Sequence, residues 1–171
     1  KKHLPEMHQG AFDDPRTRLL HEDARAYLEK TNERFDLIVV DLVEPLEEGP
    51  ACLLFTKEFY TLIRDRLTDQ GVMTMQAGMT KINELFFYGA VNRTLGEVFP
   101  VVAPYQGFIS CFGTPWGFIL ASKGTDPRKQ TAEEIDRLIA ARLDPSALGY
   151  WDGAAHLHSF NLPKFIRRAL D

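Results

Sequence analysis

The stretch Arg34-Phe35-Asp36-Leu37-Ile38-Val39-Val40-Asp41 decides the fold class. Its four consecutive apolar residues, at 37–40, lack the polar alternation of a strand that is exposed on one face. A continuous apolar run of this length is typical of a central parallel strand whose two faces are both covered. We therefore expect a sheet built around residues 37–40, with the carboxylate of Asp41 at the end of that strand.

On both sides of this strand, strand and helix patterns alternate, which predicts an α/β fold with a mostly parallel sheet. The other predicted strands are apolar stretches at residues 17–21, 72–76, 101–109 and 116–122. The predicted helices cover residues 24–30, 55–67, 83–98, 131–143 and 161–170. The last two strands follow each other without a helix, so we expect an antiparallel pair at one edge of the sheet.

Three helix boundaries carry local signals. Asp23 precedes the helix at 24–30 and can accept a hydrogen bond from its first turn. Thr131 and Glu134 have the spacing of a capping box, in which each side chain bonds a backbone N–H near the other. Gly71, after Gln70, is expected to end the helix at 55–67.

The composition predicts one ordinary domain spanning residues 1–171, with enough apolar side chain to form a core. The chain has 171 residues, 44% of them hydrophobic, and a formal net charge of −4. A mildly acidic surface disfavours binding to nucleic acid or to anionic membranes. Cys52 and Cys111 have no metal-ligand spacing and form no disulfide framework, which favours a reducing cytoplasm and predicts no metal site.

Acidic side chains follow two of the predicted strands. Ligands of open α/β sheets bind beyond the carboxyl ends of the strands, where Asp23, Asp41, Glu44 and Gln76 are expected. Asp41 and Glu44 are three residues apart in a loop, so their carboxylates could together bind an ammonium group, and one could accept its proton as a general base.

The pattern leaves simpler roles open for each of these residues. Asp41 could simply cap the end of the strand while Glu44 is exposed to solvent. Asp23 could have no role beyond capping its helix. The amide of Gln76 could bond a neighbouring loop. Phe112 and Trp116, in the loop before the last strand, are of a type that is more often core than binding surface.

Several motifs along the chain match one family in combination. They are Asp41-Leu42-Val43-Glu44-Pro45, Gly49-Pro50-Ala51, Met75-Gln76-Ala77-Gly78, Trp116-Gly117-Phe118-Ile119 and Leu162-Pro163-Lys164-Phe165. With these motifs the chain resembles the spermidine/spermine synthases, the polyamine aminopropyltransferases. The loop from 42 to 51 is longer than in typical spermidine synthases and is more similar to the thermospermine- and spermine-type branch.

The resemblance implies the C-terminal portion of a Rossmann-like class I S-adenosylmethionine-dependent transferase fold. It implies transfer of an aminopropyl group from decarboxylated S-adenosylmethionine, a co-substrate, to a polyamine, with no other cofactor. Asp41 would be the catalytic carboxylate. The residues that would bind the amine are Glu44, Gln76 and Phe112, and those that would bind the nucleoside are Asp23, Ala24, Pro50 and Ala51.

The family pattern also includes a Gly-Gly-Gly-x-Gly loop, an acidic ribose-binding residue and an N-terminal β domain, which these 171 residues do not contain. We therefore expect an inactive fragment or a truncated homologue that does not bind the nucleoside usefully. The alternatives are a methyltransferase of the same fold and a non-catalytic protein. The family's first strand would lie beside residues 37–40, so we expect either self-association into a homo-oligomer or pairing of residues 17–21 with that open edge.

Overall fold

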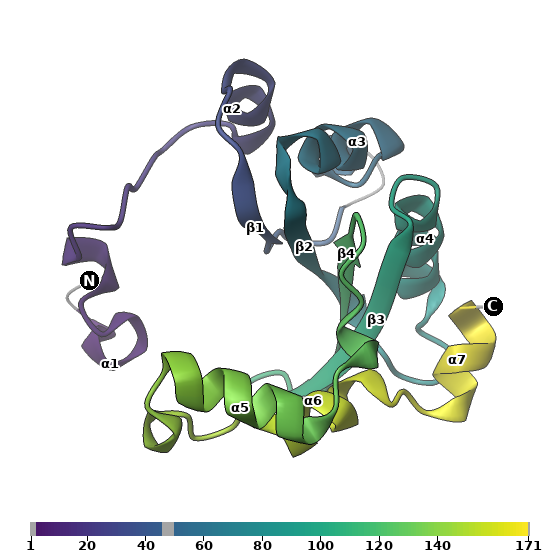
Figure 1. Cartoon of the computed structure of the whole chain (residues 1–171). Helices are drawn as coiled ribbons and strands as arrows, with labels where there is room; N and C mark the ends of the chain where they lie inside the picture. The colour runs from purple at the N-terminus through teal and green to yellow at the C-terminus, as the bar shows by residue number, and fades with distance from the viewer. Residues whose placement is uncertain (1–2, 46–49, 171) are drawn as a thin grey trace. The chain divides into compact units, whose positions relative to one another are not determined.

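The computed structural model of the protein describes residues 3–45 and 50–170, except for the side chain of Pro50. The chain divides into two compact units, Lys1–Thr31 and Asn32–Asp171, and each is described by itself below (Figure 1).

The first unit contains two helices, α1 (Pro5–His8) and α2 (Ala24–Lys30), and a short 3-10 helix, η1 (Ala11–Asp13). The predicted cap of α2 is confirmed, because Asp23 Oδ1 accepts a 2.8 Å hydrogen bond from the N–H of Ala26.

The predicted strand at residues 17–21 is wrong. Thr17 is held by local bonds instead: its N–H donates to the carbonyl of Asp14 and its hydroxyl to that of Ala11. Leu19 and Leu20 supplied the apolar signal, but both are exposed, and the segment pairs with no strand of the sheet. The expected pairing of residues 17–21 with residues 37–40 is therefore wrong as well.

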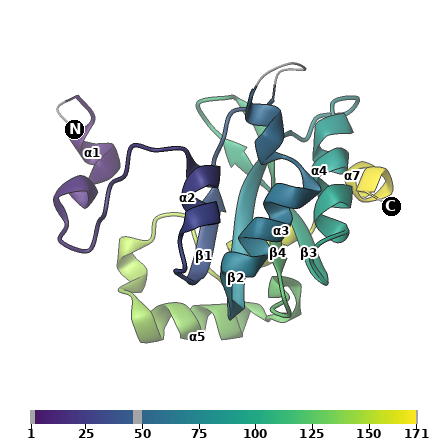
Figure 2. The ribbon, with the colours of Figure 1, turned by 90° about the horizontal axis from the view of Figure 1, so that it is seen from above.

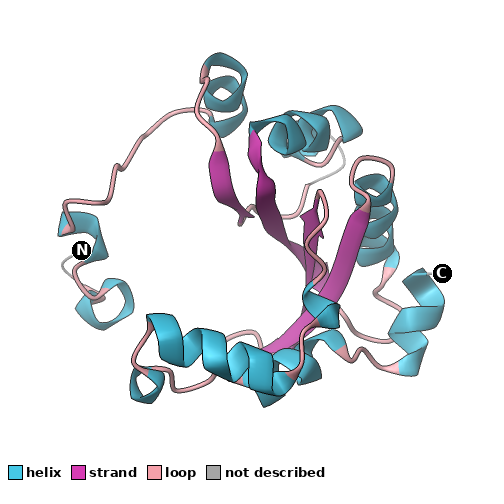
Figure 3. Ribbon diagram, viewed as in Figure 1, coloured by secondary structure: helices cyan, strands magenta, loops and turns pink. Residues whose placement is uncertain are grey.

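The second unit is built on a four-stranded sheet with the strand order β1-β2-β4-β3 (Figure 3). The strands are β1 (Phe35–Val40), β2 (Leu67–Met79), β3 (Val101–Ile109) and β4 (Thr114–Ser122). The pair β1·β2 is parallel, whereas β2·β4 and β3·β4 are antiparallel. The α/β class and the antiparallel pair are as predicted. The sheet is mixed rather than mostly parallel, because the chain returns through β4 between β3 and β2.

The strand β1 lies at the edge of the described sheet, not at its centre as the apolar run predicted, and it has the open edge expected from the resemblance. It pairs only with β2, and alternate side chains remain uncovered: Leu37 is 54% exposed and Val39 is 62% exposed. Val40, by contrast, is buried. The continuous apolar run therefore did not distinguish a covered strand from an edge strand in these residues.

Helices cover both faces of the sheet. They are η2 (Pro50–Leu54), α3 (Lys57–Arg66), α4 (Phe86–Gly96), η3 (Pro127–Lys129), α5 (Ala132–Arg142), η4 (Pro145–Ala147), α6 (Gly153–Phe160) and α7 (Lys164–Leu170). The helices α3 and α4 pack on β2, and α7 packs on α4 (Figure 2). Neighbouring residues of β4 show that α4 and α6 lie on opposite faces. Gly117 faces the ring of Tyr88 on α4, whereas Phe118 stacks on Tyr105, which contacts Phe160 on α6.

Helix ends divide into those with a local signal and those set by packing. The capping box of α5 is confirmed, since Thr131 N–H donates to Glu134 Oε2 (2.8 Å) and Glu134 N–H to Thr131 Oγ1 (3.2 Å). Gly71 does not end α3, because the helix stops at Arg66 and β2 begins at once. Gly71 instead permits close strand approach, since a Cβ there would lie 2.8 Å from the carbonyl oxygen of Phe35. The helix α6 was not predicted.

Across residues 3–45 and 50–170, no helix is long and apolar enough to cross a membrane. Within the same ranges, His, Cys, Asp and Glu side chains form no group of three or more that could hold a metal ion.

Candidate active site

A pocket of about 270 Å³ lies where β1 and β2 reach their carboxyl ends. The side chains that line it are Asp41, Gln76, Ile109, Phe112, Trp116 and Phe118. A second hollow of about 220 Å³ shares Asp41, Gln76 and Phe118 and adds Thr74 and Tyr105. Three residues singled out from the sequence, Asp41, Gln76 and Phe112, are thus brought together. Asp41 is the acidic side chain among those that line the two hollows.

Aromatic rings form the wall of this pocket. The rings of Phe112 and Trp116 have centroids 4.7 Å apart, and those of Tyr105 and Phe118 stack with centroids 5.4 Å apart. The hydroxyl of Tyr105 shares a 2.8 Å hydrogen bond with Thr74 Oγ1, and burial raises the pKa of Tyr105, so the phenol stays neutral. A carboxylate beside aromatic faces suits an aliphatic ammonium, which is attracted by both.

A β-bulge directly follows Gln76, which lines the pocket. The register between β2 and β4 shifts between Gln76 and Met79, and Gly78 has a φ of +81°. A bulge removes a backbone N–H from the ladder of strand hydrogen bonds. Here the N–H of Gly78 donates to Gln76 Oε1 at 3.0 Å, so the side chain of Gln76 replaces the missing strand partner.

Gln76 has two further partners. Its Oε1 also accepts a 3.0 Å hydrogen bond from the indole Nε1–H of Trp116. Its Nε2 donates to the carbonyl oxygen of Leu42, next to Asp41 in the chain. Gln76 is 9% exposed, so these bonds form largely out of contact with water.

Glu44 lies against the bulge rather than among the residues that line the 270 Å³ pocket. A Cβ at Gly78 would stand 2.9 Å from Glu44 Oε1, which places the carboxylate directly over the backbone of that glycine. Of the two carboxylates predicted to bind an ammonium together, the structure therefore puts Asp41 in the pocket and Glu44 against the bulge at Gly78.

The residues predicted to bind the nucleoside are divided between the two units, and each unit is described by itself. Asp23 and Ala24 belong to the first unit, where Asp23 acts as a helix cap. Ala51 is half-buried in η2, and the side chain of Pro50 lies outside the described residues. The loop residues Glu47 and Glu48 also lie outside them.

Sequence reasoning missed part of the pocket wall. Trp116 was assigned to the core, and Phe118 and Tyr105 were not singled out. Trp116 and Phe118 are two residues apart on one strand and so share a face. That spacing, together with the position of Tyr105 opposite Phe118 in the β3–β4 pair, was the available signal.

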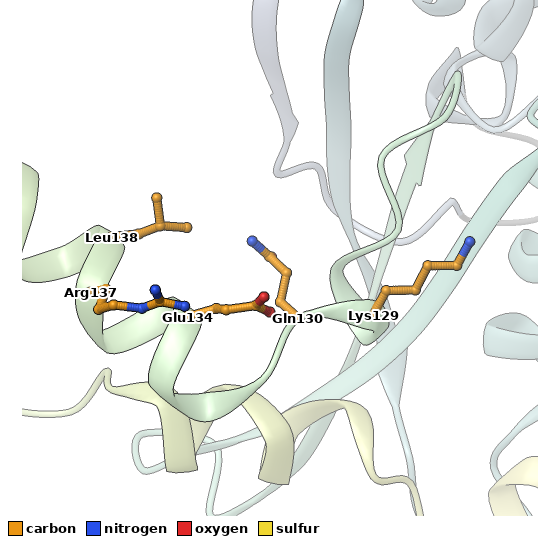
Figure 4. Close-up of a pocket in the computed structure, with 5 residues that line it drawn as sticks. All are labelled: Lys129, Gln130, Glu134, Arg137 and Leu138. Atoms are coloured by element: carbon orange, nitrogen blue, oxygen red, sulfur yellow. The ribbon is translucent and has the colours of Figure 1, made fainter.

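A larger hollow of about 550 Å³ lies elsewhere, along one continuous segment (Figure 4). Its side chains are Lys129, Gln130, Glu134, Arg137 and Leu138. The carboxylate of Glu134 is engaged in the capping box of α5. Pocket size alone therefore does not identify the active site. The smaller aromatic pocket, which contains Asp41, is the better candidate for the active site.

The mixed sheet, the helices on both faces and the pocket at the strand ends define an α/β protein of the Rossmann-like class. The model of the spermine/spermidine synthase domain matches residues 1–133. A polyamine aminopropyltransferase of Synechococcus sp. (strain JA-2-3B'a(2-13)) is 41% identical over 99% of this chain and 55% of its own length. Polyamine aminopropyltransferase 2 of Pseudomonas aeruginosa is 42% identical over 90% of this chain and 44% of its own length.

The solved structures that resemble this chain include spermidine synthases. A spermidine synthase in complex with the transition state analogue AdoDATO superposes with a TM-score of 0.83 at 29% identity, over 99% of this chain and 55% of that one. The spermidine synthase of Thermotoga maritima gives a TM-score of 0.79 at 28% identity, over 99% and 54%. The chain belongs to the spermine/spermidine synthase domain family. It spans about half the length of the curated relatives that it matches.

Proposed function

We propose that this protein contributes the amine-binding half of an aminopropyltransferase site. The observation that carries the proposal is the carboxylate of Asp41 in a pocket walled by the rings of Phe112, Trp116 and Phe118. The structural relative bound to AdoDATO and the polyamine aminopropyltransferases supply the reaction class.

The main catalytic group that the proposed reaction requires is a correctly positioned general base. An aliphatic amine is protonated at neutral pH, with a pKa near the ~10.4 of lysine. Asp41 binds the ammonium and accepts one proton, which frees the nitrogen lone pair. The nitrogen attacks the methylene carbon beside the sulfonium of decarboxylated S-adenosylmethionine. The carbon–sulfur bond breaks, its electron pair goes to sulfur, and methylthioadenosine leaves.

The other predicted residues take supporting roles in this proposal. Phe112 forms part of the aromatic wall, and Glu44 and Gln76 lie at the amine side of the site. Asp23, Ala24, Pro50 and Ala51 remain proposed nucleoside-binding residues. We also propose that the acceptor carries at least three amines, because the acidic segment at 47–48 resembles that of the thermospermine-type branch.

Product identity tests the proposed reaction. The protein, in the longest form that its reading frame encodes, is incubated with an amine and either decarboxylated or ordinary S-adenosylmethionine. Release of methylthioadenosine, with gain of an aminopropyl group by the amine, is the expected result. Release of S-adenosylhomocysteine would assign a methyltransferase instead, and no turnover with either nucleoside would contradict both.

Comparing kcat/KM for putrescine and spermidine tests the acceptor separately. A higher value for spermidine is expected. A clear preference for putrescine would overturn the proposal of a longer acceptor while leaving the reaction class intact.

A further inference from the structure

Gln76 carries an amide whose oxygen has no remaining acceptor site. A carbonyl oxygen has two lone pairs, and the indole N–H of Trp116 and the backbone N–H of Gly78 occupy both at 3.0 Å. An ammonium group has three donors and no acceptor, so it can be bound by an amide only through the oxygen. The nitrogen of Gln76 cannot bind it, and one of its two N–H groups already donates to Leu42.

These bonds connect three segments that are far apart in the chain. Trp116 lies on β4, Gln76 on β2, and Leu42 in the loop that carries Asp41 and Glu44. The strand β1 ends at Val40, so the loop from residue 41 onward makes no strand pairing with β2. The hydrogen bond from Gln76 to the carbonyl of Leu42 therefore connects this loop to the sheet.

We infer that Trp116 and Gln76 form a clamp that positions Asp41, and that Gln76 does not bind the amine directly. The indole N–H fixes the amide orientation of Gln76, with its oxygen toward β4 and the bulge and its nitrogen toward the loop. In that orientation the amide holds the backbone at Leu42, and the carboxylate of the preceding residue is directed into the pocket. Trp116 is thus a positioning residue as well as part of the aromatic wall.

Loop mobility in the 171-residue chain tests the clamp without any substrate. Trp116→Phe keeps an aromatic ring but removes the N–H. We expect the ¹⁵N order parameters of residues 42–44 to fall from about 0.85 to below about 0.6 in this variant. The matched control is Tyr88→Phe, which removes a buried hydroxyl that donates to the carbonyls of Tyr105 on β3 and Phe118 on β4 but not to the loop.

The order parameters of residues 42–44 should remain at the wild-type value in Tyr88→Phe, even though this variant loses global stability. If Trp116→Phe leaves the loop as rigid as in the wild type, or if Tyr88→Phe loosens it equally, the clamp is overturned.

The kinetic test rests on the proposed aminopropyl transfer and uses the longest natural form of the protein. Because a misplaced base lowers the rate of the chemical step, Trp116→Phe should reduce kcat about 10-fold and change the KM for the amine less than about 2-fold. Gln76→Glu separates the clamp from direct binding. A carboxylate can still accept hydrogen bonds from Trp116 and Gly78, but it cannot donate one to the carbonyl of Leu42. The clamp therefore predicts a lower kcat and no decrease in the KM for the amine.

A direct amine ligand at residue 76 predicts the opposite for Gln76→Glu, because a carboxylate binds an ammonium more strongly than an amide does. A lower KM with kcat retained would therefore overturn the inference. If the wild-type protein transfers no aminopropyl group, the proposed function fails, and the order parameters still decide whether the clamp exists.

Discussion

Gly78 has a left-handed backbone conformation and lies against the side chain of Glu44. Its φ is +81°, a region that costs other residues free energy, and an added Cβ would lie 2.9 Å from Glu44 Oε1 and 3.0 Å from Phe87 Cδ1. We expect Gly78→Ala to lower the free energy of unfolding by about 1–3 kcal/mol, measured by urea denaturation. Gly96→Ala is the control, since nothing lies within 4 Å of a Cβ there. Equal stability of the two variants would contradict the close packing of Glu44 on the bulge.

Asp41 is the residue on which the proposed chemistry depends. Asp41→Asn keeps the size of the side chain but removes the base, so in the longest form that the reading frame encodes turnover should fall roughly 100- to 10,000-fold while nucleoside binding stays nearly unchanged. The control is Asp36→Asn on β1, the strand that Asp41 follows, which loses the same charge and still accepts the 2.9 Å hydrogen bond from Thr68 Oγ1. Near-normal turnover of Asp41→Asn in a steady-state assay would remove Asp41 from the mechanism.

At the scale of elements, the short helix η3 carries a pH-dependent cap. Asp126 accepts hydrogen bonds from the backbone N–H and the guanidinium of Arg128, and the guanidinium bond holds the pKa of Asp126 below its ordinary value of 3.8. A carboxyl whose pKa is lower in the folded state stabilises the protein above its unfolded pKa, and this contribution is lost as the pH falls through the folded value.

Asp126→Asn should therefore be less stable than the wild type at pH 7, and the difference should shrink as the pH falls below about 4. Urea midpoints of both proteins at pH 7 and at pH 3 measure it. A difference that is the same at the two pH values would mean that the ionised carboxylate contributes nothing.

Helix starts whose local signal was read were predicted, and contacts between distant residues were not. Asp23 and the Thr131–Glu134 box mark helix starts because the bonds that they make span three residues. The helix α6 also has a local cap, since Asp152 Oδ1 accepts a 2.7 Å hydrogen bond from the N–H of Ala155, but this signal was overlooked beside Gly153, which has little intrinsic helix preference. A second bond holds the same helix start and appears in no local pattern: Asp136 Oδ1 accepts a 2.7 Å hydrogen bond from the N–H of Gly153 across 17 residues.

The same distinction applies to the candidate site. Asp41 and Gln76 could be placed because each follows or ends an apolar strand, and such ends gather at one edge of a parallel pair. The role of Trp116 depends on which residue of β2 it opposes, and a bulge shifts that register. Bulges leave no pattern in a single sequence that spacing can detect, so the sequence did not predict the bond between the indole and Gln76, and residue type alone favoured a core position for Trp116.

At the scale of the whole molecule, the open edge of β1 predicts how the chain behaves in solution. We propose that the 171-residue chain self-associates there, because unpaired backbone groups beside the exposed side chains of Leu37 and Val39 favour pairing with another strand. Sedimentation velocity should show concentration-dependent dimers or larger species. Leu37→Lys should shift the population toward monomer.

Leu138→Lys is the control for that experiment, since it adds the same charge at an exposed leucine of α5, which takes part in no strand pairing. A wild-type chain that stays monomeric at high concentration would contradict self-association, and an equal effect of the two lysines would exclude β1 as the contact.

The positions of the pocket residues along the chain also determine at what stage of synthesis and folding the pocket can form. The hydrogen bonds that join Leu42, Gln76 and Trp116 span 34 and 40 residues, so they belong to the contacts that form slowly in folding. During synthesis, a chain that ends after α4 already contains Asp41 and Gln76 but neither the indole nor most of the aromatic wall. Asp41 is therefore synthesised early, whereas its alignment waits for β4, the last in chain order of the four described strands.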